Sequence, residues 1–132
     1  MMRCSTTFLA TGLFFGTTVA IAAPAAADTG WIAVAKSPLR EALDWGGGPG
    51  RSQDDAERAA LQLCARMEQA TDCYVVASGP DCAAVAWDAT EPLNIAYGAI
   101  GVTPAAALRA AETAAGPFAN GPEVRCTYLG RG

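Results

Sequence analysis

Trp31-Ile-Ala-Val-Ala35 occurs a second time, with small changes, as Cys82-Ala-Ala-Val-Ala86. Each copy is followed by a short apolar segment and then by an alanine-rich stretch with helical spacing, which opens at Ser52 in the first copy and at Thr103 in the second. The correspondence extends over residues 31–77 and 82–129. Self-similarity over this span predicts a tandem repeat of one supersecondary unit.

The repeated segment has the alternation of a β-strand. Ile32 and Val34 would point to one face of the first strand, and the small residues Ala33 and Ala35 to the other. We expect a second strand in each unit, ending at Trp45-Gly46 in the first and running from Leu93 to Tyr97-Gly98 in the second. Closing strands are expected over residues 73–77 and 124–129. Trp45 and Tyr97 match in this alignment, so both are expected in the core.

The helical stretches carry recognisable ends. Ser52 with Asp55 three residues later resembles a capping box. In the second unit Thr103 precedes Pro104, which suits a first helical position, and Gly116-Pro117 would stop the helix. The sequence therefore predicts a small, disulfide-stapled α+β domain of two β-β-α-β units, in one sheet or a pair of continuous sheets. Alanine on the helices and on the facing strands would let the two approach closely.

The N-terminal segment has the form of an export signal. Arg3 precedes an apolar run that closes with Ala25-Ala-Ala27, a small-residue cleavage pattern, so residues 1–27 are interpreted as a cleaved signal peptide and residues 28–132 as a single secreted domain. An uncleaved membrane anchor is the alternative, disfavoured by Gly12 and Gly16 within the run. We therefore expect a secreted or cell-envelope location, without stable membrane insertion after cleavage.

The charge balance limits the partners. The chain has nine basic and thirteen acidic residues, and cleavage of the signal removes one of the basic ones, Arg3. The acidic domain lacks the cationic patch that neutralises phosphates, so no nucleic acid partner is expected.

Four cysteines remain after cleavage, and an even number in an exported chain predicts two disulfides. If residues 74–77 and 82–87 formed a hairpin, Cys73 and Cys82 would lie far apart. This favours Cys64–Cys73 with Cys82–Cys126, and the crossed pairing of Cys64 with Cys82 and Cys73 with Cys126 is the second choice. Zinc is disfavoured because the chain has no histidine and no C-x-x-C motif.

Few residues suggest chemistry. Without histidine, the usual base for a nucleophile is missing. Lys36-Ser37 is interpreted as a surface pair whose side chains point to opposite faces, and Asp54-Asp55 as a solvated helix start. Residues 46–52 form a glycine-rich loop before a helix, but its pattern departs from that of a phosphate-binding loop. We expect no catalytic residues, no metal and no cofactor.

The motifs resemble a known family. The W-x-A-[IV]-A string at Trp31, the helical Ala56–Cys64 segment, C-x-V-V at Cys73 and C-A-A-[VI]-A at Cys82 are similar to the secreted domain-of-unknown-function family forty-one eighty-nine of mycobacteria and related actinobacteria. The resemblance covers about residues 31–129. The resemblance implies that the chain is exported and that no catalytic residues are agreed for its family. Some members of the family are viewed as candidate host-directed effectors. Ala115 stands where a second helical cysteine would be expected, so the resemblance does not settle the pairing.

The repeat also points to interaction candidates. Trp87 aligns with Lys36, a position expected to be solvent-accessible, so Trp87 is either an exposed contact residue beside Asp88 or the cover of its own core. Lys36, Arg40 and Glu41 would form the neighbouring rim. The favoured function is a secreted, non-enzymatic protein-interaction domain with a host or envelope protein partner. An inhibitor of a secreted hydrolase is the alternative, similar in outline to the β-lactamase inhibitory proteins, and an enzyme comes third.

Overall fold

The computed structural model describes residues 30–92 and 95–128. The predicted signal peptide, residues 1–27, and the first residues of the predicted strand at Leu93 lie outside the described residues. The described elements repeat once along the chain. In the first unit they are β1 (Trp31–Lys36), β2 (Leu43–Gly48), α1 (Gln53–Arg66), the short 3-10 turn η4 (Met67–Gln69) and β3 (Tyr74–Gly79). In the second they are β4 (Cys82–Asp88), β5 (Tyr97–Gly101), α2 (Pro104–Ala115) and β6 (Ala119–Cys126).

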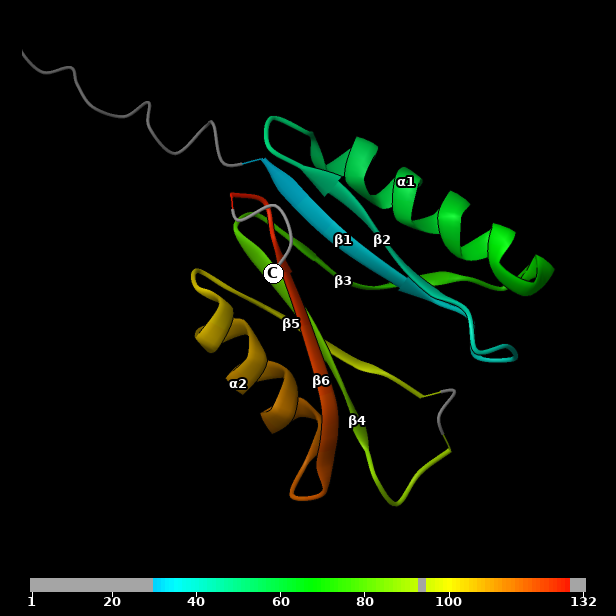
Figure 1. The fold of residues 1–132 in the computed structure, drawn as a ribbon, viewed down its shortest axis with the longest axis vertical. Coiled ribbons are helices and arrows are strands. Elements are labelled where there is room, and N and C mark those ends of the chain that lie inside the picture. The colour runs from blue at the N-terminus through cyan, green and yellow to red at the C-terminus, as the bar shows by residue number, and fades with distance from the viewer. Residues whose placement is uncertain (1–29, 93–94, 129–132) are drawn as a thin grey trace, which may run out of the picture.

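The prediction of two β-β-α-β units is confirmed, and each unit forms its own antiparallel sheet. The strand orders are β2-β1-β3 and β5-β4-β6, so the first strand of each unit lies at the centre. The two sheets lie between the helices, with α1 outside one and α2 outside the other (Figure 1). The result is a four-layer arrangement in which each sheet has one face toward its helix and the other toward the second sheet.

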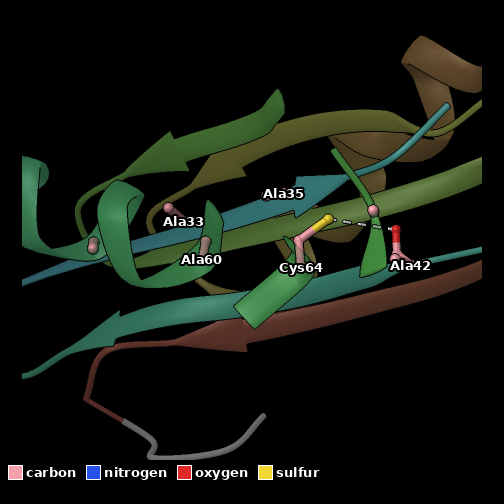
Figure 2. Packing of buried hydrophobic residues seen from close by; sticks show 7 residues of the cluster. Ala33, Ala35, Ala42, Ala60 and Cys64 are labelled. Carbon is pink, nitrogen blue, oxygen red and sulfur yellow. Dashed lines mark hydrogen bonds between the residues drawn. The ribbon is translucent and has the colours of Figure 1, made fainter. Parts of the chain in front are cut away.

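Alanine sets the spacing between each helix and its sheet. Ala33 and Ala35 of β1 pack against Ala60 and Cys64 of α1, and the second unit repeats this with an alanine-rich cluster under α2 (Figure 2). The approach is so close that a Cβ atom on Gly46 would lie 2.4 Å from the backbone nitrogen of Ala60. The expected close contact of helix and sheet is therefore confirmed.

The helix ends are those that the sequence indicates. The Ser52 side chain accepts a hydrogen bond from the Asp55 backbone N–H, and the Thr103 side chain accepts one from Ala106. Each bond satisfies one of the N–H groups that a helix start leaves without an intrahelical partner. Pro104 occupies the first turn of α2, and Gly116 ends the helix with φ of 99°.

The strand boundaries in the second unit differ from the expected ones. β5 begins at Tyr97, where the predicted strand was to end, and β6 begins at Ala119, ahead of the expected residue 124. β6 is polar and largely exposed over its first residues, so its sequence lacks the apolar signal on which the prediction depended. Pairing with the buried β4 forms the strand instead.

Both disulfides have the favoured pairing, Cys64–Cys73 and Cys82–Cys126. The premise behind that choice was wrong, because β3 and β4 belong to different sheets and form no hairpin. Cys82 instead lies directly opposite Cys126 in the β4–β6 ladder. The sulfur of Cys64 also lies 3.8 Å from the Ala42 carbonyl oxygen (Figure 2), a packing contact since a disulfide sulfur carries no proton.

The prediction that Trp45 and Tyr97 are equivalent was wrong by one residue. Val34 pairs with Trp45, whereas Val85, its counterpart in the second unit, pairs with Gly98. A shift of one residue moves a side chain to the opposite face of a strand. Trp45 therefore lies in the core between the sheets, and Tyr97 packs in the cluster beneath α2.

Candidate functional site

A surface pocket of about 270 Å³ combines residues of both units. It lies where the last residues of β1 and β4 are found, and these two strands diverge toward their ends in Figure 1. The first unit contributes Lys36, Glu41 and Leu43, and the second contributes Trp87, Asn120 and Gly121.

The opening at this place follows from the difference between Trp45 and Gly98. On one side of the sheet pair, a Cβ on Gly98 would lie 2.6 Å from the Val76 carbonyl oxygen, so β5 and β3 are in backbone contact. On the other side, the Trp45 ring lies between the sheets, with the guanidinium carbon of Arg125 in β6 at 5.3 Å from its centroid. An indole thus separates β2 from β6. Leu43, two residues before Trp45 on the same face of β2, borders the pocket.

Lys36 is buried within the pocket wall. Its exposed fraction is 2%, and Nζ donates to the carbonyl oxygens of Ser37 and Arg40, both at 2.8 Å. Burial removes the ammonium group from water and lowers the pKa of Lys36, while the carboxylate of Glu41 acts in the opposite direction. The expectation of a solvent-accessible Lys36 was wrong, because two backbone carbonyls replace water around the charge.

The loop between β1 and β2, residues 37–42, is held by hydrogen bonds to its own backbone and to Asp72. Ser37 Oγ donates to Asp72 Oδ1 at 2.5 Å and accepts from the Arg40 backbone N–H at 3.0 Å. Asp72 Oδ2 accepts from the Leu39 backbone N–H at 3.2 Å. Ser37 is fully buried, so Lys36-Ser37 is not the surface pair that the sequence suggested.

Leu39, at the tip of this loop, is 82% exposed. An apolar side chain this exposed on a loop with so many internal bonds resembles the anchor residues of protein interfaces. The sequence interpretation missed Leu39. An apolar residue following Pro38 in an otherwise polar connection was the available signal.

Trp87 lies between the two alternatives that the sequence left open, an exposed contact residue and a cover of its own core. It is partly buried and packs against the cluster between the sheets, and it also borders the pocket. Gly121 lies beside it, since a Cβ there would be 3.7 Å from Cε3 of the indole. Trp87 is therefore a wall of the pocket rather than a protruding side chain.

Two of the interaction candidates, Asp88 and Arg40, are not among the residues that line the pocket. Asp88 Oδ1 accepts from the backbone N–H and the hydroxyl of Thr90, and these bonds lower the pKa of Asp88. Its role is to close the turn after β4. Arg40 contributes its backbone to the loop, and its side chain is not among the pocket-lining groups.

The other chemical candidates have structural roles. Gly46 and Gly47 belong to β2 and contact α1, and Arg58 pairs with Asp54 and Asp55 at the helix start. Within residues 30–92 and 95–128, no group of three or more histidine, cysteine or acidic side chains is placed to hold a metal ion. No helix in this part of the chain combines the length and the apolar character needed to cross a membrane.

No protein-family model matches the chain, and no curated protein or solved structure matches it either. The site is therefore interpreted from its own residues. Two disulfides in a small domain are compatible with an extracytoplasmic location.

Proposed function

We propose that this protein is a secreted, non-enzymatic binding domain whose partner is a protein of the host or of the cell envelope. The supporting observation is the pocket–loop surface, which we define as the pocket residues together with Leu39. Its members come from both units and combine an exposed apolar anchor with a concave site. Protein interfaces commonly have this composition, with apolar anchor residues and pockets at the centre and polar groups at the rim.

The rigidity of the loop supports binding in particular. Ordering a flexible loop on association costs free energy, and a loop already held in place avoids much of that cost. Here Lys36 Nζ and Asp72 hold the loop before any partner arrives. These hydrogen bonds also argue against a catalytic pair of Lys36 and Ser37. The Ser37 hydroxyl is bonded to Asp72, and the Lys36 amine is bonded to two backbone carbonyls.

Inhibition of a secreted hydrolase is the second candidate, favoured by Leu39 alone. An apolar side chain on a rigid tip is suited to filling a partner's specificity pocket. The backbone N–H groups of Leu39 and Arg40 are already bonded, so such an inhibitor would obstruct the site rather than bind as an extended substrate. The resemblance of the motifs supports a further proposal, that the chain belongs to the actinobacterial secreted family and is exported through residues 1–27.

The test is capture of partners by the oxidised protein from host-cell and envelope extracts, identified by mass spectrometry. Leu39→Ala and Trp87→Ala are compared with wild type at unchanged melting temperature. Val102→Ala is the matched control, since Val102 is an apolar residue of 70% exposure at the opposite end of the sheets. A partner lost by the first two variants and kept by the control supports the proposal. Retention by all variants, or no partner at all, refutes it.

A further inference from the structure

The pocket has a mixed lining that restricts what can enter it. The side chains of Leu43 and Gly121 have no polar atom, that of Trp87 is a large ring with one N–H group, and those of Lys36, Glu41 and Asn120 are polar. Its volume of about 270 Å³ is just under the range of about 300–1,000 Å³ typical of sites for whole small molecules. It is therefore suited to one ring or one large side chain.

The two charges of the pocket argue for a neutral occupant. A cationic group would meet the ammonium of Lys36, and an anionic group would meet the carboxylate of Glu41 in a chain of net charge −4. Desolvating an unbalanced charge against either residue is unfavourable. A neutral group that both donates and accepts hydrogen bonds suits the pair.

Lys36 supplies a donor for such a group. An ammonium has three N–H bonds, and two of them are used by the Ser37 and Arg40 carbonyls. Within residues 30–92 and 95–128, no third acceptor of Nζ is found. A buried donor of this kind, in the wall of a pocket, is satisfied when an entering group offers an oxygen.

We propose that the pocket binds the side chain of a tyrosine that protrudes from the partner protein, an inference that rests on the proposed function. The phenol ring would pack against Trp87 and Leu43. Its hydroxyl would accept from Lys36 Nζ and donate to the Glu41 carboxylate. Tyrosine combines a large apolar body with one polar tip, which is why it is common at interface centres.

A sugar ring is the competing neutral occupant. Its several hydroxyls need more polar partners than Lys36, Glu41 and Asn120 provide, and the side chains of Leu43 and Gly121 offer none. The phenol, with a single hydroxyl, leaves fewer groups unsatisfied.

The experiment is an NMR titration of the ¹⁵N-labelled protein with N-acetyl-tyrosinamide. The controls are N-acetyl-phenylalaninamide, which lacks only the hydroxyl, and methyl glucoside. We expect the tyrosine probe to shift the Gly121 amide and Trp87 indole signals, with a dissociation constant on the order of millimolar. The phenylalanine probe should bind roughly tenfold more weakly, as loss of a hydrogen bond to a charged group implies.

Variants identify the groups involved. Glu41→Gln keeps the shape of an exposed side chain. It should lower the affinity for the tyrosine probe severalfold and leave the affinity for the phenylalanine probe unchanged. Gln62→Ala, on the exposed face of α1, should change neither. Equal binding of the two amino acid probes, binding of the glucoside alone, or no binding at Gly121 and Trp87 would overturn the tyrosine assignment.

The two proposals fail separately. Loss of partner capture in Trp87→Ala without any tyrosine binding removes the ligand assignment and leaves the binding surface. Tyrosine binding without an effect of Trp87→Ala or Leu39→Ala on capture removes the proposed function and leaves the pocket as a tyrosine site.

Discussion

Removing the Cys82–Cys126 disulfide should destabilise the protein more than removing Cys64–Cys73. The two bonds close segments of different length, with sequence separations of 44 and 9 residues. In the chain-entropy account, loop closure restricts the unfolded chain by about 4 kcal/mol for the long bond and about 2.6 kcal/mol for the short one at 25 °C. The pair Cys82→Ala with Cys126→Ala should therefore lower the free energy of unfolding by about 1.4 kcal/mol more than the pair Cys64→Ala with Cys73→Ala.

The assay is equilibrium unfolding in urea followed by circular dichroism, on protein exported under oxidising conditions. Alanine is the suitable replacement because Cys64 and Cys82 are fully buried, where an added hydroxyl would need a partner. Fitted slopes in urea must be compared, since loss of a cross-link expands the unfolded state and raises the slope. A larger loss from the short bond, or a loss below about 1 kcal/mol from both, would contradict the entropic reasoning.

Three further changes test the packing, the buried amine and the helix start. Gly98→Val should lower the free energy of unfolding by about 1–3 kcal/mol, because its side chain would overlap the Val76 carbonyl oxygen; thermal unfolding measures this, and an unchanged melting temperature would contradict it. Burial lowers the Lys36 pKa, so the unfolded chain binds more protons between that lowered pKa and 10.5, and stability should rise with pH across this window. Urea unfolding at alkaline pH values up to 10.5 should show this rise in wild type and lose it in Lys36→Met; the same slope in both would exclude Lys36 as its source. Ser52→Ala should cost about 1 kcal/mol through loss of the bond to the Asp55 N–H, whereas Ser52→Asp should retain stability in the same assay.

The sequence was sufficient for features that depend on local chemistry. Ser52 and Thr103 mark helix starts because their hydroxyls satisfy nearby backbone N–H groups. The repeat then placed each helix after two strands. These predictions hold because the interactions involved lie within a few residues of one another.

Features that depend on distant pairing were less predictable. The polar start of β6 carries no strand pattern, and its pairing with β4 joins residues far apart in the chain. Trp45 and Tyr97 look equivalent because each precedes a glycine, but the connection between β4 and β5 changes the register. A shift of one residue in register leaves the amino-acid composition unchanged, but it decides on which face of the strand each side chain lies.

The candidate site likewise has features that the sequence predicted and features that depend on the folded structure. The comparison of the two repeats singled out Trp87, and Glu41 was expected in the rim beside it; both border the pocket. The burial of Lys36 depends on two carbonyls oriented by the loop, and the prominence of Leu39 depends on bonds to Asp72. Hydrogen bonds of this kind follow from the folded geometry, so the sequence pattern contained no sign of them.

The presence of Trp45 and Gly98 at equivalent positions of the two units has a consequence for how such a molecule can diversify. In a symmetric dimer of single units, every substitution appears twice, so a bulky residue at one position must be bulky at its mate. Joining two units in one chain lifts that constraint. One side of the sheet pair can then be sealed by a glycine while the other is held open by an indole, and only the open side is left to acquire specificity.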